Sequence, residues 1–191
     1  MKNNKAFTLV ELLAVVVILG ILMMIAIPNT LSMIDKNKMS TYIENAKTFV
    51  SLVKNKVQTD KSLEIPYDST GAFVMSLGYL NTNDINETPY GGEYDKDASF
   101  VAILFDESSH KYKYYVHLVS CLEGTSCSKS DPNHWRGIDL VEVTALNLDS
   151  RFDYVSPSGV KADYITGNGP TIDLSSVGDF SGKTLTVMRT S

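Results

Sequence analysis

An uninterrupted apolar segment near the amino end is the feature that most restricts how this chain folds. Between Phe7 and Ile27, Thr8 and Glu11 are the only clearly polar residues. Its 21 residues in α-helical conformation would rise about 31 Å, which matches the roughly 30 Å hydrocarbon thickness of a bilayer. The segment therefore predicts a helix that can span a membrane.

The residues on either side of this segment predict its orientation. Lys2 and Lys5 precede it, and positive charge favours keeping that end in the cytoplasm, with everything after Ile27 on the far side. An ordinary secretory signal ends in a small-residue cleavage site, whereas residues 25–28 here read Ile-Ala-Ile-Pro and continue into a helical pattern. We therefore expect the helix to be retained.

Glu11 is an unusual residue for such a segment. An ionised carboxylate costs about 2.5 to 3.5 kcal/mol near the bilayer centre. No Lys, Arg or His occurs between residues 6 and 35, so the helix itself offers no adjacent cation. Two interpretations stay open. Another molecule supplies the positive group, through an amino terminus newly exposed at residue 7, or Glu11 lies at the headgroup level and is hydrated or protonated.

The rest of the chain reads as one water-soluble domain. The 191 residues are 43% apolar and 20% charged, and the formal net charge of −5 argues against a strongly basic nucleic-acid binder. Beyond Pro28, apolar residues recur at three- and four-residue steps, which predicts an amphipathic helix continuing to about Thr59 and packing on a sheet. The stripe comprises Met39, Tyr42, Ile43, Ala46, Phe49, Val50, Val53 and Val57. Because proline lacks an N–H, we expect a bend or local melting near Pro28.

Further elements follow from local patterns. Phe73, Val74, Leu77 and Leu80 have helical spacing and predict a short second helix over Ala72–Leu80, followed by a polar loop over Asn81–Asp97. β-Branched and aromatic residues predict strands over Ser99–Phe105, Lys113–Ser120, Ile138–Val143, Val160–Ile165, Thr171–Leu174 and Lys183–Met188. One long helix followed by a run of strands is typical of an α+β fold with an antiparallel sheet.

The amino end resembles a known family. Residues 5–13, Lys-Ala-Phe-Thr-Leu-Val-Glu-Leu-Leu, followed by an apolar run and Pro28, are similar to the prepilin leader and amino-terminal helix of type IV pilins and pseudopilins. The match is closest over residues 5–28 and extends loosely to about residue 57. It combines a short basic leader, the Phe-Thr-Leu-Val-Glu junction, a carboxylate four residues beyond Phe7 and a later proline.

The resemblance implies a processing site and an assembly contact. Prepilin peptidase would cut between Ala6 and Phe7 and methylate the new amino group; Ala6 replaces the usual glycine but is also small. Glu11 would then pair with the Phe7 ammonium of a neighbouring subunit, with Pro28 in the assembly helix. The implied divisions are a leader over 1–6, a transmembrane and assembly half over 7–28, an amphipathic half over 29–59 and an extracellular globular domain over 60–191. The implied fold is α+β and pilin-like.

The implied function is that of a structural filament subunit. It would be a single-pass cytoplasmic membrane protein with its carboxy-terminal domain outside, and afterwards part of a cell-surface fibre serving adhesion, motility or DNA uptake. Partners would be the peptidase, other pilin subunits and the assembly machinery, while DNA binding has no support beyond scattered lysines. A secretion-like or competence pseudopilin is the alternative. A membrane-tethered ligand-binding or enzymatic domain is a less favoured one, since a tether has no need for Glu11.

Other chemistry has few candidates. Cys121 and Cys127 allow one small disulfide loop, with two free thiols as the alternative. His110, His117 and His134 have no metal-binding spacing, and no nucleophile motif surrounds a serine. Glu93, Asp95 and Asp97 could bind Ca²⁺, as loops of some pseudopilins do. Acidic clusters in loops are, however, far more often only solvated. We therefore expect no metal, no cofactor and no enzymatic activity.

Overall fold

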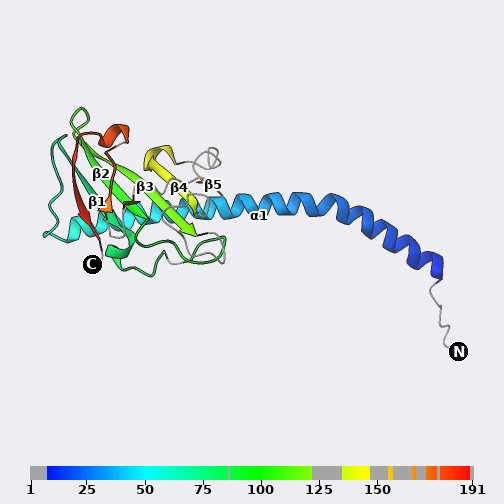
Figure 1. Ribbon diagram of the computed structural model, residues 1–191. Helices are drawn as coiled ribbons and strands as arrows, with labels where there is room; N and C mark the ends of the chain where they lie inside the picture. The colour runs from blue at the N-terminus through cyan, green and yellow to red at the C-terminus, as the bar shows by residue number, and fades with distance from the viewer. Residues whose placement is uncertain are drawn as a thin grey trace. The chain divides into compact units, whose positions relative to one another are not determined.

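The computed structural model describes residues 8–85, 87–121, 135–146, 155–156, 165–166, 171–175 and 177–189 (Figure 1). Within these ranges the side chains at 25–29, 121, 135, 155–156, 165–166 and 171 are not described. The chain divides into two compact units, residues 1–38 and residues 39–191, which are treated separately below.

A single long helix, α1 (Leu9–Thr59), contributes residues to both units. The sequence predicts a bend or local melting near Pro28. The helix is continuous through residue 28, so the melting does not occur. In the first unit the large apolar side chains between Leu9 and Met24 are 48% to 81% exposed. Among the helical residues whose side chains are described, a set interrupted at 25–29, no stretch is long and apolar enough to cross a membrane.

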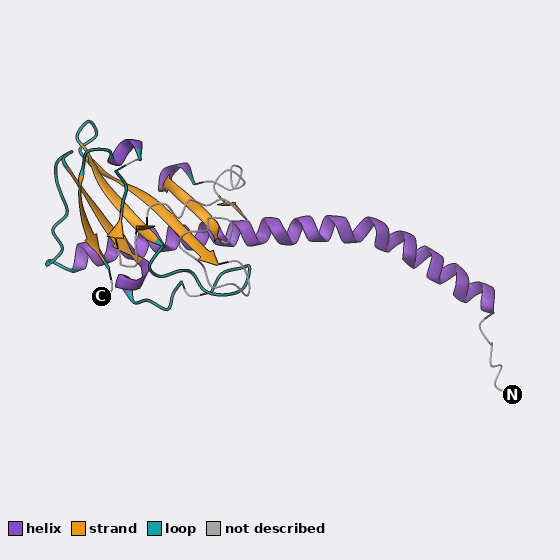
Figure 2. Cartoon of the chain, in the orientation of Figure 1, coloured by secondary structure: helices purple, strands orange, loops and turns teal. Residues whose placement is uncertain are grey.

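The second unit contains a six-stranded sheet (Figure 2). Its strands, in spatial order, are β5 (Val155–Ser156), β4 (Trp135–Glu142), β3 (Lys111–Cys121), β2 (Phe100–Asp106), β1 (Gly71–Ser76) and β8 (Thr184–Met188). Neighbours are antiparallel except β1 and β8, which are parallel. The short elements are α2 (Leu77–Leu80), η2 (Val143–Ala145), η3 (Gly178–Phe180) and the pair β6 (Ile165–Thr166) and β7 (Thr171–Ile172).

The second half of α1 packs on one face of this sheet. Its buried residues Tyr42, Ile43, Ala46, Phe49, Val50 and Val53 share a core with side chains of β1 to β4, such as Phe73, Met75, Val101, Val116 and Ile138. The predicted amphipathic stripe and its packing surface are therefore confirmed. On the outer side of the helix, Glu44 and Lys47 form an ion pair at 3.7 Å.

A second core covers the opposite face of the sheet. Alternate residues of β1 and β2, including Ala72, Val74 and Phe100, pack there against Leu174 and Phe180 from the carboxy-terminal segment. Both faces of the central strands are thus buried. This two-sided burial explains why β1 contains consecutive apolar residues rather than a strict apolar–polar alternation.

Tyr42 fixes the position of α1 on the sheet through its hydroxyl group. Its Oη lies 3.0 Å from the carbonyl oxygen of Arg136, 3.3 Å from that of Leu118 and 3.4 Å from Ser120 Oγ. Burial raises the pKa of the Tyr42 phenol well above its ordinary value, so the group remains a hydrogen-bond donor. The ring also packs edge-on against Tyr94.

The predicted α+β class, with a long amino-terminal helix on a mostly antiparallel sheet, is confirmed. The helix predicted over Ala72–Leu80 is wrong for its first five residues, which lie in strand β1, and right only for Leu77–Leu80. The strands predicted over Ser99–Phe105, Lys113–Ser120 and Ile138–Val143 correspond to β2, β3 and β4. Of the strand predicted over 160–165, only Ile165 lies within the described residues.

Candidate functional site

The amino end of α1 is closed by a reciprocal contact between Thr8 and Glu11. The backbone N–H of Thr8 and its hydroxyl both donate to Glu11 Oε2, each at 2.8 Å, while the N–H of Glu11 lies 3.3 Å from Thr8 Oγ1. This arrangement is a capping box, in which the residue before the helix and the third helical residue satisfy each other's backbone N–H groups. The side chain of Glu11 therefore has a structural partner inside its own chain.

The capping box does not use all the hydrogen-bonding capacity of the carboxylate. Two carboxylate oxygens offer about four lone-pair positions, and Thr8 supplies two donors, both to Oε2. The group is exposed at the tip of the helix. A further cationic donor can therefore approach without first breaking the cap.

The remaining residues predicted for processing and assembly are placed only in part. Ala6 and Phe7 lie outside the described residues, so the contact predicted between Glu11 and a Phe7 amino group stays a prediction. Pro28 lies within α1, and its side chain is not described. The predicted disulfide also stays a prediction, since Cys121 ends β3 without a described side chain and Cys127 lies outside the described residues.

The histidines and acidic loop have structural surroundings where they are described. His117 is buried, with Nδ1 2.9 Å from the carbonyl oxygen of Ala98 and the ring stacked on Phe100. Asp95 accepts hydrogen bonds from the N–H groups of Asp97 and Ala98, which closes a turn. Over the part of the chain that the structure describes, no three His, Cys, Asp or Glu side chains are grouped as metal ligands would be.

Sequence reasoning missed the capping box, although its signal was present. A Ser or Thr followed three residues later by an acidic residue, just before an apolar run, predicts such a helix start. Thr8 and Glu11 have this spacing. In an apolar segment the cost of an unpaired carboxylate is the more conspicuous signal, and it points to a partner outside the helix rather than to Thr8.

The amino end of the chain matches a known family model. Residues 1–27 fit the model of the prokaryotic N-terminal methylation motif, which is typical of type IV pilins and pseudopilins. The motif implies processing by a prepilin peptidase and export with an amino-terminal membrane anchor. Searches of curated proteins and of solved structures found no match.

Proposed function

We propose that the chain is a structural subunit of a type IV pilus or a related filament. The observation that carries this proposal is the methylation motif over residues 1–27, joined directly to a helix whose exposed apolar surface begins at a single capped carboxylate. The helix continues into a globular α+β unit, where its buried residues between Tyr42 and Val53 form part of the core. Such a chain can anchor in a membrane or a filament by the first half of α1 and display a folded domain on the second half.

Assembly in this proposal depends on a change in the charge at the amino end. Cleavage between Ala6 and Phe7 would create an ammonium group next to the start of α1. Moving an apolar helix from lipid into a bundle of like helices keeps its surroundings apolar, so packing and polar pairing must drive association. The Phe7 ammonium of one subunit and the Glu11 carboxylate of the next would neutralise two charges that are costly when unpaired.

Adhesion, motility and DNA uptake are the finer roles within this proposal. A secretion-type or competence pseudopilin is the alternative. The amino-terminal motif is common to pilins and pseudopilins. The large globular portion favours the pilin, since the second compact unit buries both faces of its described central strands. We propose a structural rather than an enzymatic role.

Intact-mass analysis of the full chain, produced in cells with and without a prepilin peptidase, tests this proposal. We expect the peptidase to remove residues 1–6 and to add one methyl group to Phe7. Ala6→Gly should be processed at least as well as the natural chain, whereas the bulky Ala6→Leu should block cleavage and keep the chain out of sheared filaments. Retention of the initial methionine in peptidase-containing cells would contradict the proposal.

A further inference from the structure

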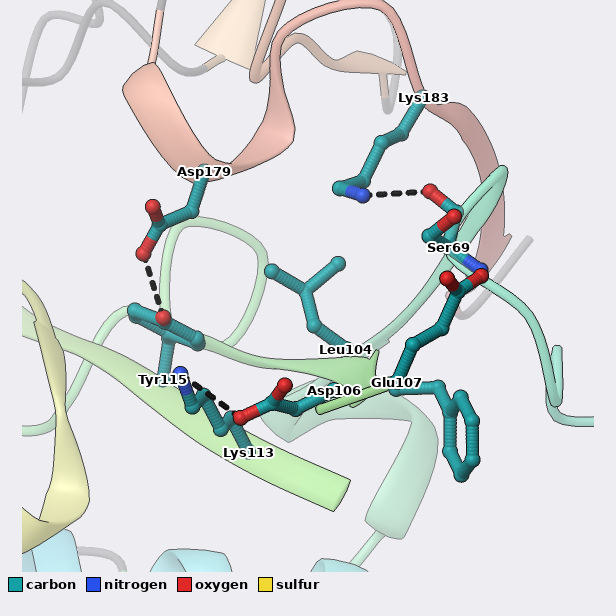
Figure 3. Close-up of a pocket in the computed structure, with 9 residues that line it drawn as sticks. Ser69, Leu104, Asp106, Glu107, Lys113, Tyr115, Asp179 and Lys183 are labelled. Atoms are coloured by element: carbon teal, nitrogen blue, oxygen red, sulfur yellow. Dashed lines mark hydrogen bonds and ion pairs between the residues drawn. The ribbon is translucent and has the colours of Figure 1, made fainter. Parts of the chain in front are cut away.

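The globular unit carries a polar pocket of about 210 Å³ that the filament proposal does not use. Its walls come from distant parts of the chain, as Figure 3 shows. Asp106 ends β2, and Lys113 and Tyr115 lie in the first half of β3. Asp179 lies in η3, and Lys183 directly precedes β8. All of these residues lie within the second compact unit.

Two of the polar side chains in the pocket are held by each other. Tyr115, only 8% exposed, donates its hydroxyl to Asp179 Oδ2 at 2.5 Å. Burial, and then the Asp179 carboxylate, raise the pKa of the Tyr115 phenol, so Tyr115 stays a donor. Asp179 is therefore oriented by a group that does not ionise near neutral pH. Its second carboxylate oxygen is not needed for this bond.

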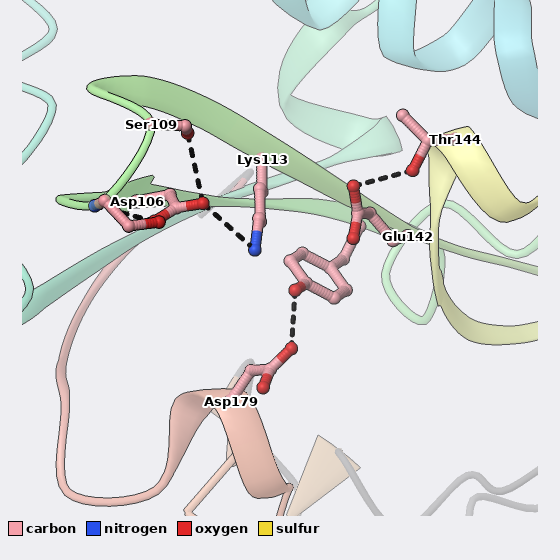
Figure 4. Close-up of polar contacts among 8 residues, drawn as sticks. Asp106, Ser109, Lys113, Glu142, Thr144 and Asp179 are labelled. Atoms are coloured by element: carbon pink, nitrogen blue, oxygen red, sulfur yellow. Dashed lines mark hydrogen bonds and ion pairs between the residues drawn. The ribbon is translucent and has the colours of Figure 1, made fainter.

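Asp106, in contrast, is fully occupied by its neighbours. It accepts hydrogen bonds from the N–H and hydroxyl of Ser108 and from the hydroxyl of Ser109, and it pairs with Lys113 at 3.1 Å (Figure 4). These contacts, led by the Ser108 hydroxyl, hold the pKa of Asp106 far below its usual range. Asp106 therefore acts as part of the pocket wall and not as a free acceptor.

Lys183 supplies the donors on the other side of the pocket. Its ammonium group donates to the carbonyl oxygen of Ser69, which fixes its position, and an ammonium has three N–H groups in total. Asp179 and Lys183 thus place an open acceptor and open donors around one space. Figure 3 shows Leu104 between them. Leu104 is 6% exposed and gives the pocket an apolar component, whereas the Phe105 ring packs against His110 and Tyr112.

The charges in the pocket exclude several ligand classes. Three carboxylates, from Asp106, Glu107 and Asp179, and two ammonium groups, from Lys113 and Lys183, leave one net negative charge, which disfavours an anion such as phosphate. Among the described residues no three acidic or histidine side chains are arranged as metal ligands. The volume is below the roughly 300 to 1,000 Å³ of pockets for drug-sized molecules, so the occupant is small.

We propose that this pocket binds one neutral polyhydroxylated ring, such as a single sugar residue of a glycan. Each sugar hydroxyl both donates and accepts, so adjacent hydroxyls can donate to Asp179 and accept from Lys183. The C–H face of the ring matches the apolar side chain of Leu104. If the chain forms a filament, as proposed above, weak single sites repeated along it would bind a glycan-covered surface through multivalency. The single site itself does not depend on filament assembly.

The test uses the full chain, labelled for amide NMR and held in a detergent without a sugar headgroup. The probes are glucose, galactose and N-acetylglucosamine, with glycine and inorganic phosphate as the zwitterionic and anionic comparators. The proposal expects saturable shifts at Leu104, Tyr115 and Asp179 with at least one sugar. It is overturned if no sugar gives saturable shifts, or if glycine or phosphate binds there more tightly than every sugar.

Two variants with matched controls locate the binding. Asp179→Asn keeps an oxygen for the Tyr115 hydroxyl and replaces the open acceptor with a donor, and Lys183→Gln removes the ammonium. Each should raise the dissociation constant of the sugar at least tenfold. Asp84→Asn, at an exposed site, and Lys47→Gln, at a partly exposed one, both lie outside the pocket lining and should leave the dissociation constant unchanged. Unchanged binding in both Asp179→Asn and Lys183→Gln, with amide spectra that show an intact fold, would overturn the proposal.

Discussion

At position 137 the backbone of β4 passes so close to its neighbours that only glycine fits. A β-carbon there would lie 2.1 Å from the carbonyl oxygen of Leu118, 2.8 Å from Val119 Cα and 2.9 Å from the hydroxyl of Tyr42. The first two atoms belong to β3 and the third to α1, so one absent methyl group lets the helix hydroxyl reach the sheet.

We therefore predict that Gly137→Ala lowers the free energy of unfolding by ~3 kcal/mol, because backbone atoms cannot move aside as a flexible side chain can. Urea unfolding of the full chain in detergent, followed by fluorescence, measures the change. Gly178→Ala is the control, since a β-carbon there meets nothing within 4 Å. An equal effect of the two substitutions would show that the close approach at Gly137 is not what matters.

Asp60 follows the end of α1 and has a shifted titration. The Ser62 hydroxyl donates to Asp60 Oδ1 at 2.6 Å, and Lys56 lies 3.0 Å from Oδ2. The Ser62 hydroxyl first, and then Lys56, lower the pKa of Asp60 from 3.8 to about 2. Because the folded value is depressed, the stabilisation is complete above pH about 4 and is lost as the pH falls toward 2.

Ser62→Ala should therefore raise the pKa of Asp60 toward 3.8 while the Lys56 contact and the Ser62 N–H remain. Carboxyl-carbon NMR titration of Asp60 measures the midpoint directly. Ser51→Ala, which removes a hydroxyl bonded to the Lys47 carbonyl on the same helix, should leave the midpoint near 2. A midpoint that is the same in Ser62→Ala and the natural chain would rule out the hydroxyl as the main cause.

At the scale of elements, β1 shows where a periodic pattern fails. Phe73, Val74, Leu77 and Leu80 fit a helix, but Phe73 and Met75 face α1 while Ala72 and Val74 face the second core. A short apolar run buried on both faces satisfies a helical and a strand pattern equally well. The deciding contacts are the pairings of β1 with β2 and β8, and they come from residues far away in the chain.

Met75→Lys distinguishes the two conformations. Residue 75 lies off the predicted helical face, so a helix would tolerate lysine there, whereas in β1 the Met75 side chain is fully buried. We predict a loss of at least ~3 kcal/mol in the free energy of unfolding, because a lysine would be buried without a partner. Thermal unfolding measures the loss, and Tyr67→Lys, at a side chain 80% exposed, should change stability little.

Other elements could be predicted because their signals are local and long. The stripe from Met39 to Val57 repeats over several turns, and the β2–β3 hairpin joins two strand patterns through residues 107–110. The parallel pairing of β8 with Gly71–Met75 could not be predicted, since no local pattern specifies a partner more than a hundred residues away. The pocket was missed for the same reason, because Tyr115 and Asp179 meet only through the fold.

For the whole molecule, the two compact units should respond independently to substitution. Among the residues whose burial the structure describes, every buried core residue lies at or after Tyr42, whereas Glu11 belongs to the first unit. We therefore expect Glu11→Val to change the stability of the globular unit by less than ~0.5 kcal/mol. Under the filament proposal it should nevertheless reduce incorporation into filaments severely, because the neighbouring ammonium group would lose its carboxylate partner.

Two measurements on protein from the same cells check the predicted stability and the predicted loss of assembly. Hydrogen exchange of the β2 and β3 amides reports on the globular unit, and the ratio of sheared filament protein to membrane protein reports on assembly. Glu11→Val should lower only the ratio, while Met75→Lys should weaken amide protection strongly yet still allow cleavage before Phe7. Normal incorporation of Glu11→Val would contradict the proposed pairing of Glu11 with the Phe7 ammonium group. Lost amide protection in that variant would show instead that the start of α1 helps to hold the globular unit together.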